Sequence, residues 1–212
     1  MERMESSVSS FIAEKLPNLV RKGLKNTLIP VTSVLTKWVK KVDSDLENSG
    51  IDSINSGSTW WVAVIKNKTI YFANTGDSRA ILIKFNKDIF SNDLVSQIQN
   101  ERKDSQLRNS ETKMQINPIV SIWSTNDHSW EVEAEQQRII SSGGRVERIN
   151  KKIGPLRVWL KDEDKPGLAM TRSIGDHIAK NIGVICTPEV HFEKLDLHQM
   201  SSNSCFYEYI LK

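Results

Sequence analysis

Cysteine is scarce in this chain of 212 residues, and the sequence also lacks any long apolar run. Its two cysteines, Cys186 and Cys205, have neither a second pair for a disulfide framework nor the spacing of metal ligands, so we expect a reduced chain in the cytoplasm or the nucleus. No segment approaches the roughly 20 apolar residues of a membrane span, and residues 1–10 lack the basic and apolar regions of a signal peptide. These absences argue against a disulfide-rich secreted protein and predict no membrane partner.

A strong excess of one charge is also lacking. Lys and Arg number 29 and Asp and Glu number 26, and the net charge of +3 is too small to predict nucleic acid as the main partner. The six tryptophans could stack on bases, but Trp60, Trp61, Trp123 and Trp159 lie in apolar stretches, which favours packing in a core. The sequence contains no Walker loop, no Rossmann Gly-x-Gly fingerprint and no HExxH zinc motif. A basic nucleic-acid binder is therefore the least favoured of three hypotheses for this chain.

Two amphipathic helices are predicted in the first part of the chain. Apolar side chains recur at helical spacing in residues 6–16, and Pro17 is expected to end or kink that helix. The spacing returns in residues 31–47, and the following segment, rich in Gly, Ser and Asn, predicts a loop before Thr59. The apolar stripe of the second helix consists of Val34, Leu35, Trp38, Val39, Val42 and Leu46.

From Thr59 onward the pattern changes to short strands. Residues 59–66 and 69–75 are apolar, aromatic and β-branched, and the polar residues between them predict a hairpin turn. Further strands are expected in residues 79–85, 119–123, 145–149, 156–160 and 183–195, and a strand, a turn and a short helix in residues 166–180.

One more helix is predicted among the strands, in residues 129–144. Ser129 is its candidate N-cap and Gly143 its expected stop. The apolar contacts expected for this helix are Val132, Ile139 and Ile140. Because helices come first and strands follow, the order favours an α+β fold over a βαβ alternation.

The turn in "NTGDSRA" carries an acid and a base, Asp77 and Arg79. Gly76 can adopt a positive φ, and Asp77 and Ser78 can bond to the local backbone, which is a structural role. The functional alternative is that Asp77 directs its carboxylate from a strand end into a cleft, as an oxygen ligand for a hard cation such as Mg²⁺. Taken alone, the turn favours the structural role.

Two other polar motifs have a structural and a functional interpretation. Asp127 and His128 could hold a metal or act as a general acid and base, although such a pair in a loop is more often polar surface. The segment "SSGGRV" is interpreted as a helix C-cap before a strand. A phosphate-binding role is disfavoured there, because the glycines lie at the end of a helix rather than at its start.

Five segments follow one another in an informative order: "GSTWWVAVI", "YFANTGDSRAIL", "DHSWEVEAEQQRIISSGGRVERI", "RVWLKDEDKPGLAMTRSIGD" and "GVICTPEV". In this order they resemble the metal-dependent protein serine/threonine phosphatases of the type 2C family. The resemblance covers residues 8–191, and "GDSRA" and "GLAMTRSIGD" are its most specific parts. The segment "VSSFIAEKLP" is similar to the first long helix of that family.

The resemblance implies an α-β-β-α sandwich of two antiparallel sheets flanked by helices. It also implies a phosphoprotein substrate, hydrolysed at phosphoserine or phosphothreonine by a water that bridges two Mg²⁺ or Mn²⁺ ions. Asp77 matches the turn aspartate that helps to hold a third, looser ion in the family, so it is expected to be a metal ligand. Arg79 is expected to hold the turn by pairing with a neighbouring acid or carbonyl.

The sequence also departs from the family. The Asp-Gly-His-Gly stretch before the first long helix and the upstream phosphate-binding arginine are missing, and no Asp-Gly or Asp-Asn pair occurs anywhere. We therefore expect an incomplete sandwich over residues 1–212 without the principal metal ligands, with a surface insertion at 86–116 and a divergent tail at 198–212. A truncated phosphatase and a catalytically inactive binding or regulatory module both fit these departures, and the oligomeric state is left open.

Overall fold

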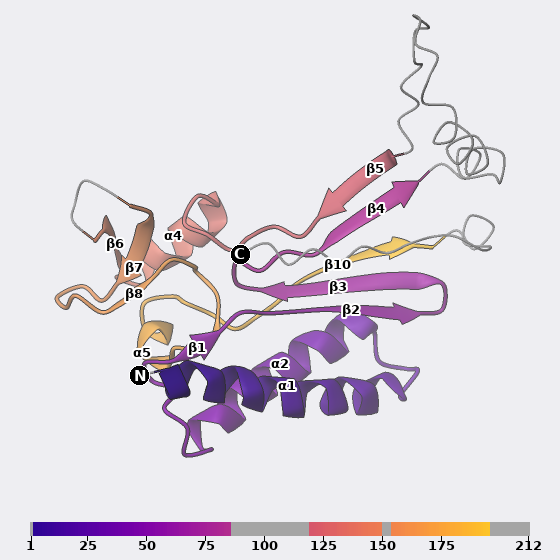
Figure 1. Cartoon of the computed structure of the whole chain (residues 1–212), viewed down its shortest axis with the longest axis horizontal. Helices are drawn as coiled ribbons and strands as arrows, with labels where there is room; N and C mark the ends of the chain where they lie inside the picture. The colour runs from indigo at the N-terminus through magenta and orange to yellow at the C-terminus, as the bar shows by residue number, and fades with distance from the viewer. Residues whose placement is uncertain (1, 86–118, 150–153, 196–212) are drawn as a thin grey trace, which may run out of the picture.

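Figure 1 shows the computed structural model of the chain, which describes residues 2–85, 119–149 and 154–195. The expected insertion at 86–116 and tail at 198–212 lie outside the described residues. The helices are α1 (Glu2–Leu24), α2 (Val31–Glu47), α4 (Glu133–Ser141) and α5 (His177–Lys180). The strands are β1 (Gly57–Ser58), β2 (Trp60–Lys66), β3 (Thr69–Thr75), β4 (Ile81–Phe85), β5 (Ile119–Ser124), β6 (Arg145–Arg148), β7 (Leu156–Trp159), β8 (Pro166–Leu168), β9 (Ile174–Gly175) and β10 (Glu189–Lys194).

The sequence predicts that Pro17 ends or kinks the first helix, and helix α1 continues through Pro17 to Leu24, so the prediction of an end at Pro17 is wrong. Leu16 and Val20 lie four residues apart on one face, and both are buried in the core. Burying such side chains contributes about 1.5–3 kcal/mol each, which together offsets the roughly 3 kcal/mol that a proline costs inside a helix. The apolar stripe therefore carries the helix past the proline.

Helix α2 confirms the stripe expected from the sequence. The valines and leucines of the stripe are buried, and Trp38 is partly buried beside them. Together α1 and α2 form a layer along one face of the β10-β3-β2 sheet (Figure 1). Ala73 of β3 and Ile174 of β9 complete the core between the helices and the sheet.

The hairpin of β2 and β3 is also confirmed. The two strands pair in antiparallel register from Trp60↔Thr75 to Lys66↔Thr69. Asn67 and Lys68 connect them with positive φ values of 51° and 59°. Two such residues in succession are what a type I′ turn requires, and that turn matches the twist of the paired strands.

Strands β3 and β4 belong to different sheets, although only a short turn separates them. β4 pairs with β5, whereas β3 lies between β10 and β2. The second sheet lies on the side of the first sheet away from α1 and α2 (Figure 1). Phe72 of β3 and Leu82 of β4 are both buried in one apolar cluster, which joins the two sheets.

A third body contains α4, α5 and the β6-β7-β8 sheet, and its core includes Ile139 and Val158. Helix α4 begins at Glu133 with Val132 as its N-cap, so Ser129 is not the cap. Ser129 instead forms an isolated bridge with Met170. Only Ile139 of the three expected apolar contacts is buried. Val132 precedes the helix as its N-cap, and Ile140 lies about 100° around the helix from Ile139; both are exposed. Gly143 does end the helix, with a φ of 80°.

The fold is therefore α+β, with one helical layer and two antiparallel sheets of an α-β-β-α sandwich in the described residues. The short β1–β9 pair is an addition that the sequence pattern does not predict. Among the described residues, no helix is both long enough and apolar enough to cross a bilayer.

Candidate functional site

The turn after β3 brings Asp77 to the end of a central strand. Gly76 has a φ of 105°, and a Cβ atom at this position would lie 2.4 Å from Cγ2 of Thr59. The position therefore requires glycine both for its backbone and for its space. Ser78 and Thr59 share a hydrogen bond of 2.7 Å between their hydroxyl oxygens, which ties the turn to the start of β2.

Arg79 confirms the expectation that it pairs with a neighbouring acid. Its Nε and Nη2 atoms donate to the two carboxylate oxygens of Asp127 over 3.0 and 2.9 Å. The hydrogen bonds and the charge of Asp127 raise the pKa of Arg79. Both oxygens of Asp127 accept a hydrogen bond from Arg79, so this residue ties the loop after β5 to the turn.

Backbone groups fix the turn from a second side. The side-chain amide of Asn74 donates to the carbonyl oxygens of Gly76 and Asn126 over 3.2 and 3.0 Å. The Ala80 amide donates to the Thr125 hydroxyl over 3.0 Å, and the Thr125 amide donates to the Ala80 carbonyl over 2.9 Å. The loop after β5 thus runs directly against the turn that holds Asp77.

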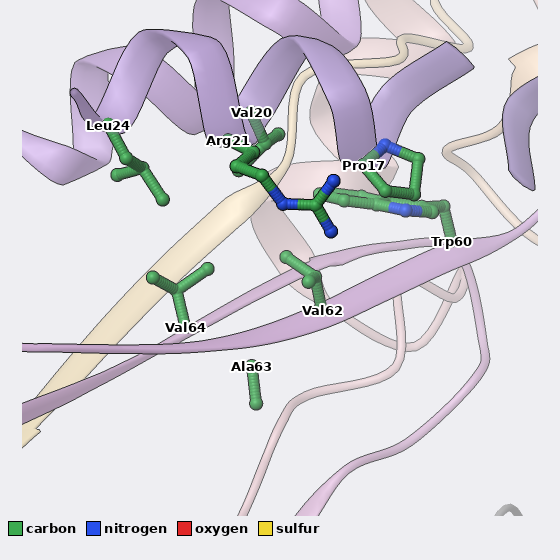
Figure 2. A pocket seen from close by; sticks show the side chains of 8 residues that line it. All are labelled: Pro17, Val20, Arg21, Leu24, Trp60, Val62, Ala63 and Val64. Carbon is green, nitrogen blue, oxygen red and sulfur yellow. The ribbon is translucent and has the colours of Figure 1, made fainter. Parts of the chain in front are cut away.

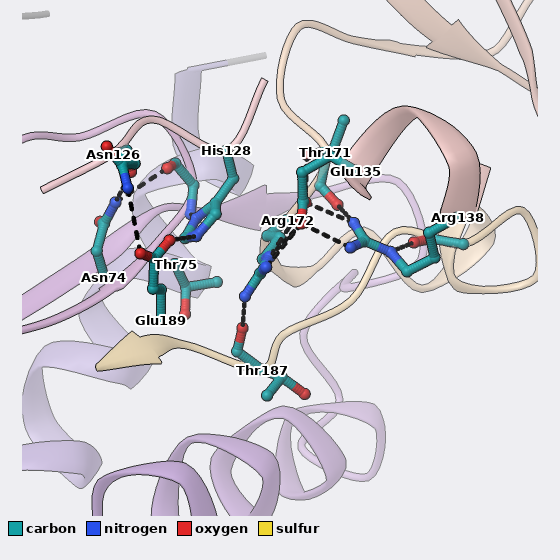
Figure 3. A network of polar contacts seen from close by, with 12 residues as sticks. Asn74, Thr75, Asn126, His128, Glu135, Arg138, Thr171, Arg172, Thr187 and Glu189 are labelled. Carbon is teal, nitrogen blue, oxygen red and sulfur yellow. Dashed lines mark hydrogen bonds and ion pairs between the residues drawn. The ribbon is translucent and has the colours of Figure 1, made fainter. Parts of the chain in front are cut away.

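His128 is buried, with 2% of its side chain exposed, so the interpretation of this loop as polar surface is wrong at this position. Its Nδ1 atom accepts a hydrogen bond of 3.0 Å from the Gly76 amide, and its own amide donates to the Gly76 carbonyl over 3.0 Å (Figure 3). Its Nε2 atom lies 3.4 Å from Oε2 of Glu189. Burial and the charge of Arg172 lower the pKa of His128 more than Glu135 and Glu189 raise it.

A buried carboxylate, Glu135 of α4, lies close to this loop. Arg138 and Arg172 each donate to both of its carboxylate oxygens, at 2.6–3.1 Å, and the Thr171 hydroxyl donates to Oε2 over 2.7 Å (Figure 3). Burial raises the pKa of Glu135, but the hydrogen bonds lower it by more than burial raises it. The pKa of Glu135 is therefore far below its ordinary value. Arg172 also donates to the carbonyl of Thr187, over 2.8 Å. The network joins α4 to the segments before β9 and β10.

Sequence reasoning missed this network. Glu135 lies four residues before Ile139, on the same helix face, and a carboxylate on a buried stripe signals a partner. Its partner Arg172 is distant in the chain, however, and no local pattern connects the two residues.

A second polar cluster lies where α2 meets β9 and α5. Oδ1 of Asp43 accepts a hydrogen bond of 2.8 Å from the Gly175 amide and lies 3.5 Å from both Nε2 of His177 and Nζ of Lys180. Burial and the charge of Asp43 raise the pKa of the Cys186 thiol to about 11. Cys186 is therefore a neutral thiol at physiological pH and not a nucleophile.

Asp77, the expected metal ligand, is exposed, and it has no hydrogen bond or ion pair with another described residue. Its carboxylate is free to bind a cation. The described residues contain no group of three or more His, Cys, Asp or Glu side chains that could hold a metal ion. Mg²⁺ and Mn²⁺ need several oxygen ligands in near-octahedral geometry, so the described residues do not fit a complete metal centre, to which Asp77 would contribute a single carboxylate.

A groove of about 310 Å³ lies elsewhere, between α1 and β2 (Figure 2). Apolar side chains line it, among them Pro17, Trp60 and Val62, and Arg21 reaches over it from the helix. The groove is on the helical side of the first sheet and lacks a carboxylate or a histidine in its lining. It has no catalytic chemistry of its own.

Comparison with known proteins gives one consistent result. The profile of the protein phosphatase 2C family matches residues 4–206. Probable protein phosphatase 2C 73 of Oryza sativa subsp. japonica is 36% identical over 172 residues, which are 81% of this chain and 34% of that protein. Probable protein phosphatase 2C 61 of Arabidopsis thaliana is 35% identical over 155 residues, which are 73% of this chain and 37% of that protein. The chain thus spans about a third of the length of these curated relatives.

Solved structures support the same sandwich. The serine-threonine phosphatase 2C of Toxoplasma gondii aligns with a TM-score of 0.56 and 18% identity, over 92% of this chain and 59% of that chain. A sex-determining protein of C. elegans aligns with a TM-score of 0.59 and 19% identity, over 89% of this chain and 37% of that chain. At such identities the likeness shows the fold alone.

Proposed function

The chain belongs to the protein phosphatase 2C family, and from this premise we propose that it is part of a metal-dependent protein serine/threonine phosphatase. Its substrates would be phosphoproteins, and its metal ions Mg²⁺ or Mn²⁺. The observation that carries the proposal is the turn at the end of β3, which holds Asp77 with a free and exposed carboxylate. The turn is fixed from one side by the buried His128 contact and from the other by the partly exposed Arg79–Asp127 pair, as a ligand position requires.

The same site limits what the chain does alone. A divalent ion would supply an activated water for attack on the phosphate ester. One carboxylate does not hold such an ion, and the described residues contain no group of three or more His, Cys, Asp or Glu side chains that could hold it. We therefore propose that hydrolysis requires acidic ligands beyond the described residues.

A catalytically inactive module is the second candidate function. The observation that favours it is the same lack of a ligand cluster in the described residues, combined with a scaffold that is well packed around the turn. Such a module would bind a partner and would not need a metal. A transcript that encodes a longer phosphatase would favour the first candidate, and a transcript that starts at Met1 would favour the second.

An activity assay tests the proposal that hydrolysis requires ligands beyond the described residues. The chain is incubated with a phosphothreonine peptide and with an aryl phosphate in millimolar Mn²⁺, next to an intact member of the family. We expect little or no turnover, and no difference between the chain and its Asp77→Ala variant. Turnover comparable to the intact enzyme would contradict the proposal that further ligands are required.

We also propose a location in the cytoplasm or the nucleus and no nucleic-acid partner. The neutral thiol of Cys186 supports the location, and the small net charge of +3 supports the lack of a nucleic-acid partner.

A further inference from the structure

The Gly76 peptide has both of its polar groups engaged by one residue. The Gly76 amide donates to Nδ1 of His128 over 3.0 Å, and the Gly76 carbonyl accepts from the His128 amide over 3.0 Å. Asn74 donates to the same carbonyl over 3.2 Å. All of these groups are buried, so water does not compete for the hydrogen bonds.

The Gly76 contact selects one form of the His128 ring. A ring nitrogen that accepts a hydrogen bond carries no proton, so the neutral imidazole must carry its proton on Nε2. Nε2 lies 3.4 Å from a carboxylate oxygen of Glu189, and it has no hydrogen bond within the described part of the chain. A carboxylate at this distance favours a protonated Nε2 and disfavours the opposite tautomer.

Glu189 is itself held in place beside the ring. It is the first residue of β10 and pairs in register with Asn74 of β3. Its second oxygen accepts a hydrogen bond of 3.2 Å from the Asn126 side chain. The imidazole therefore connects β10 to the turn after β3 through side chains rather than through the sheet hydrogen bonds.

We propose that His128 is a positioning residue, which in its Nε2-protonated form, facing Glu189, holds the Gly76 peptide and so fixes the direction of the Asp77 carboxylate. Asp77 has no described partner of its own, so the peptide before it determines where the carboxylate points. The consequence for metal-dependent hydrolysis rests on the proposed function, whereas the ring form and the hydrogen bond do not.

The Arg79–Asp127 pair on the other side of the turn does not replace this contact. The Arg79 and Asp127 side chains are 43% and 29% exposed, and ion pairs that face solvent contribute about 0–1 kcal/mol. His128 acts on the peptide directly before Asp77, from a fully buried position.

Nitrogen NMR of the wild-type chain is the first test, and it needs no variant that could fail to fold. The chain has four histidines, and ¹⁵N-labelled imidazoles distinguish their tautomers. At neutral pH, His128 is expected to show a protonated Nε2 and an unprotonated, hydrogen-bonded Nδ1. A proton on Nδ1 would overturn the proposal.

Amide exchange at Gly76 is the second test, with two substitutions of matched polarity. The side-chain oxygen of His128→Asn can occupy the place of Nδ1 and accept the Gly76 amide, whereas the amide group of His128→Gln reaches the place of Nε2 and cannot. We expect exchange at Gly76 to be about tenfold faster or more in His128→Gln, and within about threefold of wild type in His128→Asn. Equal acceleration in both variants would overturn the positioning role.

A reference amide and a control substitution in the same loop separate positioning from loss of fold. The Phe72 amide in β3 reports global opening, and its exchange should change less than that of Gly76 in either variant. Glu131→Gln, an exposed acid without a described contact, should leave Gly76 and the His128 tautomer unchanged. No phosphatase activity enters these measurements, so the result of the activity assay leaves the His128 proposal standing, and the result of the NMR and exchange experiments leaves the proposed function standing.

Discussion

At the scale of single residues, Glu135 and Asp77 are two carboxylates with opposite surroundings. Glu135 is 2% exposed and receives hydrogen bonds from two arginines and a threonine. Asp77 is exposed and has no described partner. The first carboxylate is part of the structure, and its loss should cost stability. The second is free for a ligand, and its loss should cost very little.

Glu135→Gln should lower the free energy of unfolding by about 3 kcal/mol at neutral pH, because two partly buried arginines lose their buried counter-charge. The lowered pKa also gives a pH dependence. The pKa of Glu135 is lower in the folded protein than its ordinary value of 4.5, so ionised Glu135 stabilises the fold above about pH 4.5. This contribution to the free energy of unfolding is lost progressively as the pH falls below about 4.5.

Urea unfolding from neutral pH to about pH 3 checks both statements. The wild type should lose stability below about pH 4.5 more steeply than Glu135→Gln does. Asp176 acts in the opposite direction, because burial raises its pKa and its protonation therefore favours the folded state at low pH. Asp176 is present in both proteins, so it reduces the loss of stability with falling pH equally in both. Parallel pH profiles would show that Glu135 is not the group concerned.

Adjacent substitutions at the turn should differ sharply. Asp77→Ala should change the free energy of unfolding by less than about 1 kcal/mol, since it removes no described contact. Gly76→Ala should cost about 1–3 kcal/mol, because its φ is 105° and its Cβ would lie 2.4 Å from Thr59. Melting temperatures of the two variants provide the comparison. In a longer enzyme that contains the further ligands, Asp77→Ala should also raise the Mn²⁺ concentration required for activity.

A loss of several kcal/mol in Asp77→Ala, with an unchanged Mn²⁺ requirement in the longer enzyme, would identify Asp77 as a structural turn residue.

At the scale of elements, α1 shows how packing overrides a local preference. The helix contains Pro17 in its interior and still continues to Leu24, because Leu16 and Val20 are buried against the core. The proline removes one backbone donor and crowds the carbonyl one turn earlier. Stability is therefore lost at a position where the side chain only lines the groove beside β2.

Pro17→Ala should stabilise the chain by about 1–2 kcal/mol, because it restores a helical hydrogen bond while giving up the smaller benefit of a rigid unfolded chain. Thermal unfolding measures the gain. Glu14→Ala, at an exposed position of the same helix, is the matched control and should stay within about 0.5 kcal/mol. A destabilised Pro17→Ala would mean that the ring packing in the groove outweighs the backbone cost.

At the scale of the whole molecule, the order of the first sheet leaves β2 at an edge in the described residues. The strand carries the apolar sequence "WWVAVIK", and Ile65 within it is 59% exposed. An apolar edge strand is a template for pairing with another chain. We therefore expect marginal stability and concentration-dependent association of the isolated chain.

Ile65→Lys should increase the monomer fraction, because a charge on the edge strand opposes pairing between chains. Sedimentation velocity over a range of concentrations measures this fraction. Ile140→Lys is the matched control, since Ile140 is 58% exposed on α4, away from any strand edge, and it should not change association. A clean wild-type monomer with a sharp, cooperative thermal transition would count against an association-prone edge.

The local elements of this protein follow from sequence patterns. Helix α2, the β2–β3 hairpin and the end of α4 at Gly143 match their predictions, because each depends on neighbours a few residues apart. The order of family motifs also predicted the sandwich and the pairing of Arg79 with a nearby acid.

Contacts between distant segments were decided only by the tertiary structure. Burial of a stripe, a property of the core, carried α1 past Pro17. The Gly76 peptide exchanges hydrogen bonds with His128, which lies 52 residues later in the chain. Arg172 donates to Glu135, which lies 37 residues earlier. Such pairs leave no periodic signal in the sequence, since a buried histidine in a loop has the same local pattern as an exposed one. Their geometry is set by how the sheets and α4 pack, and that packing places His128 behind the turn and leaves Asp77 free.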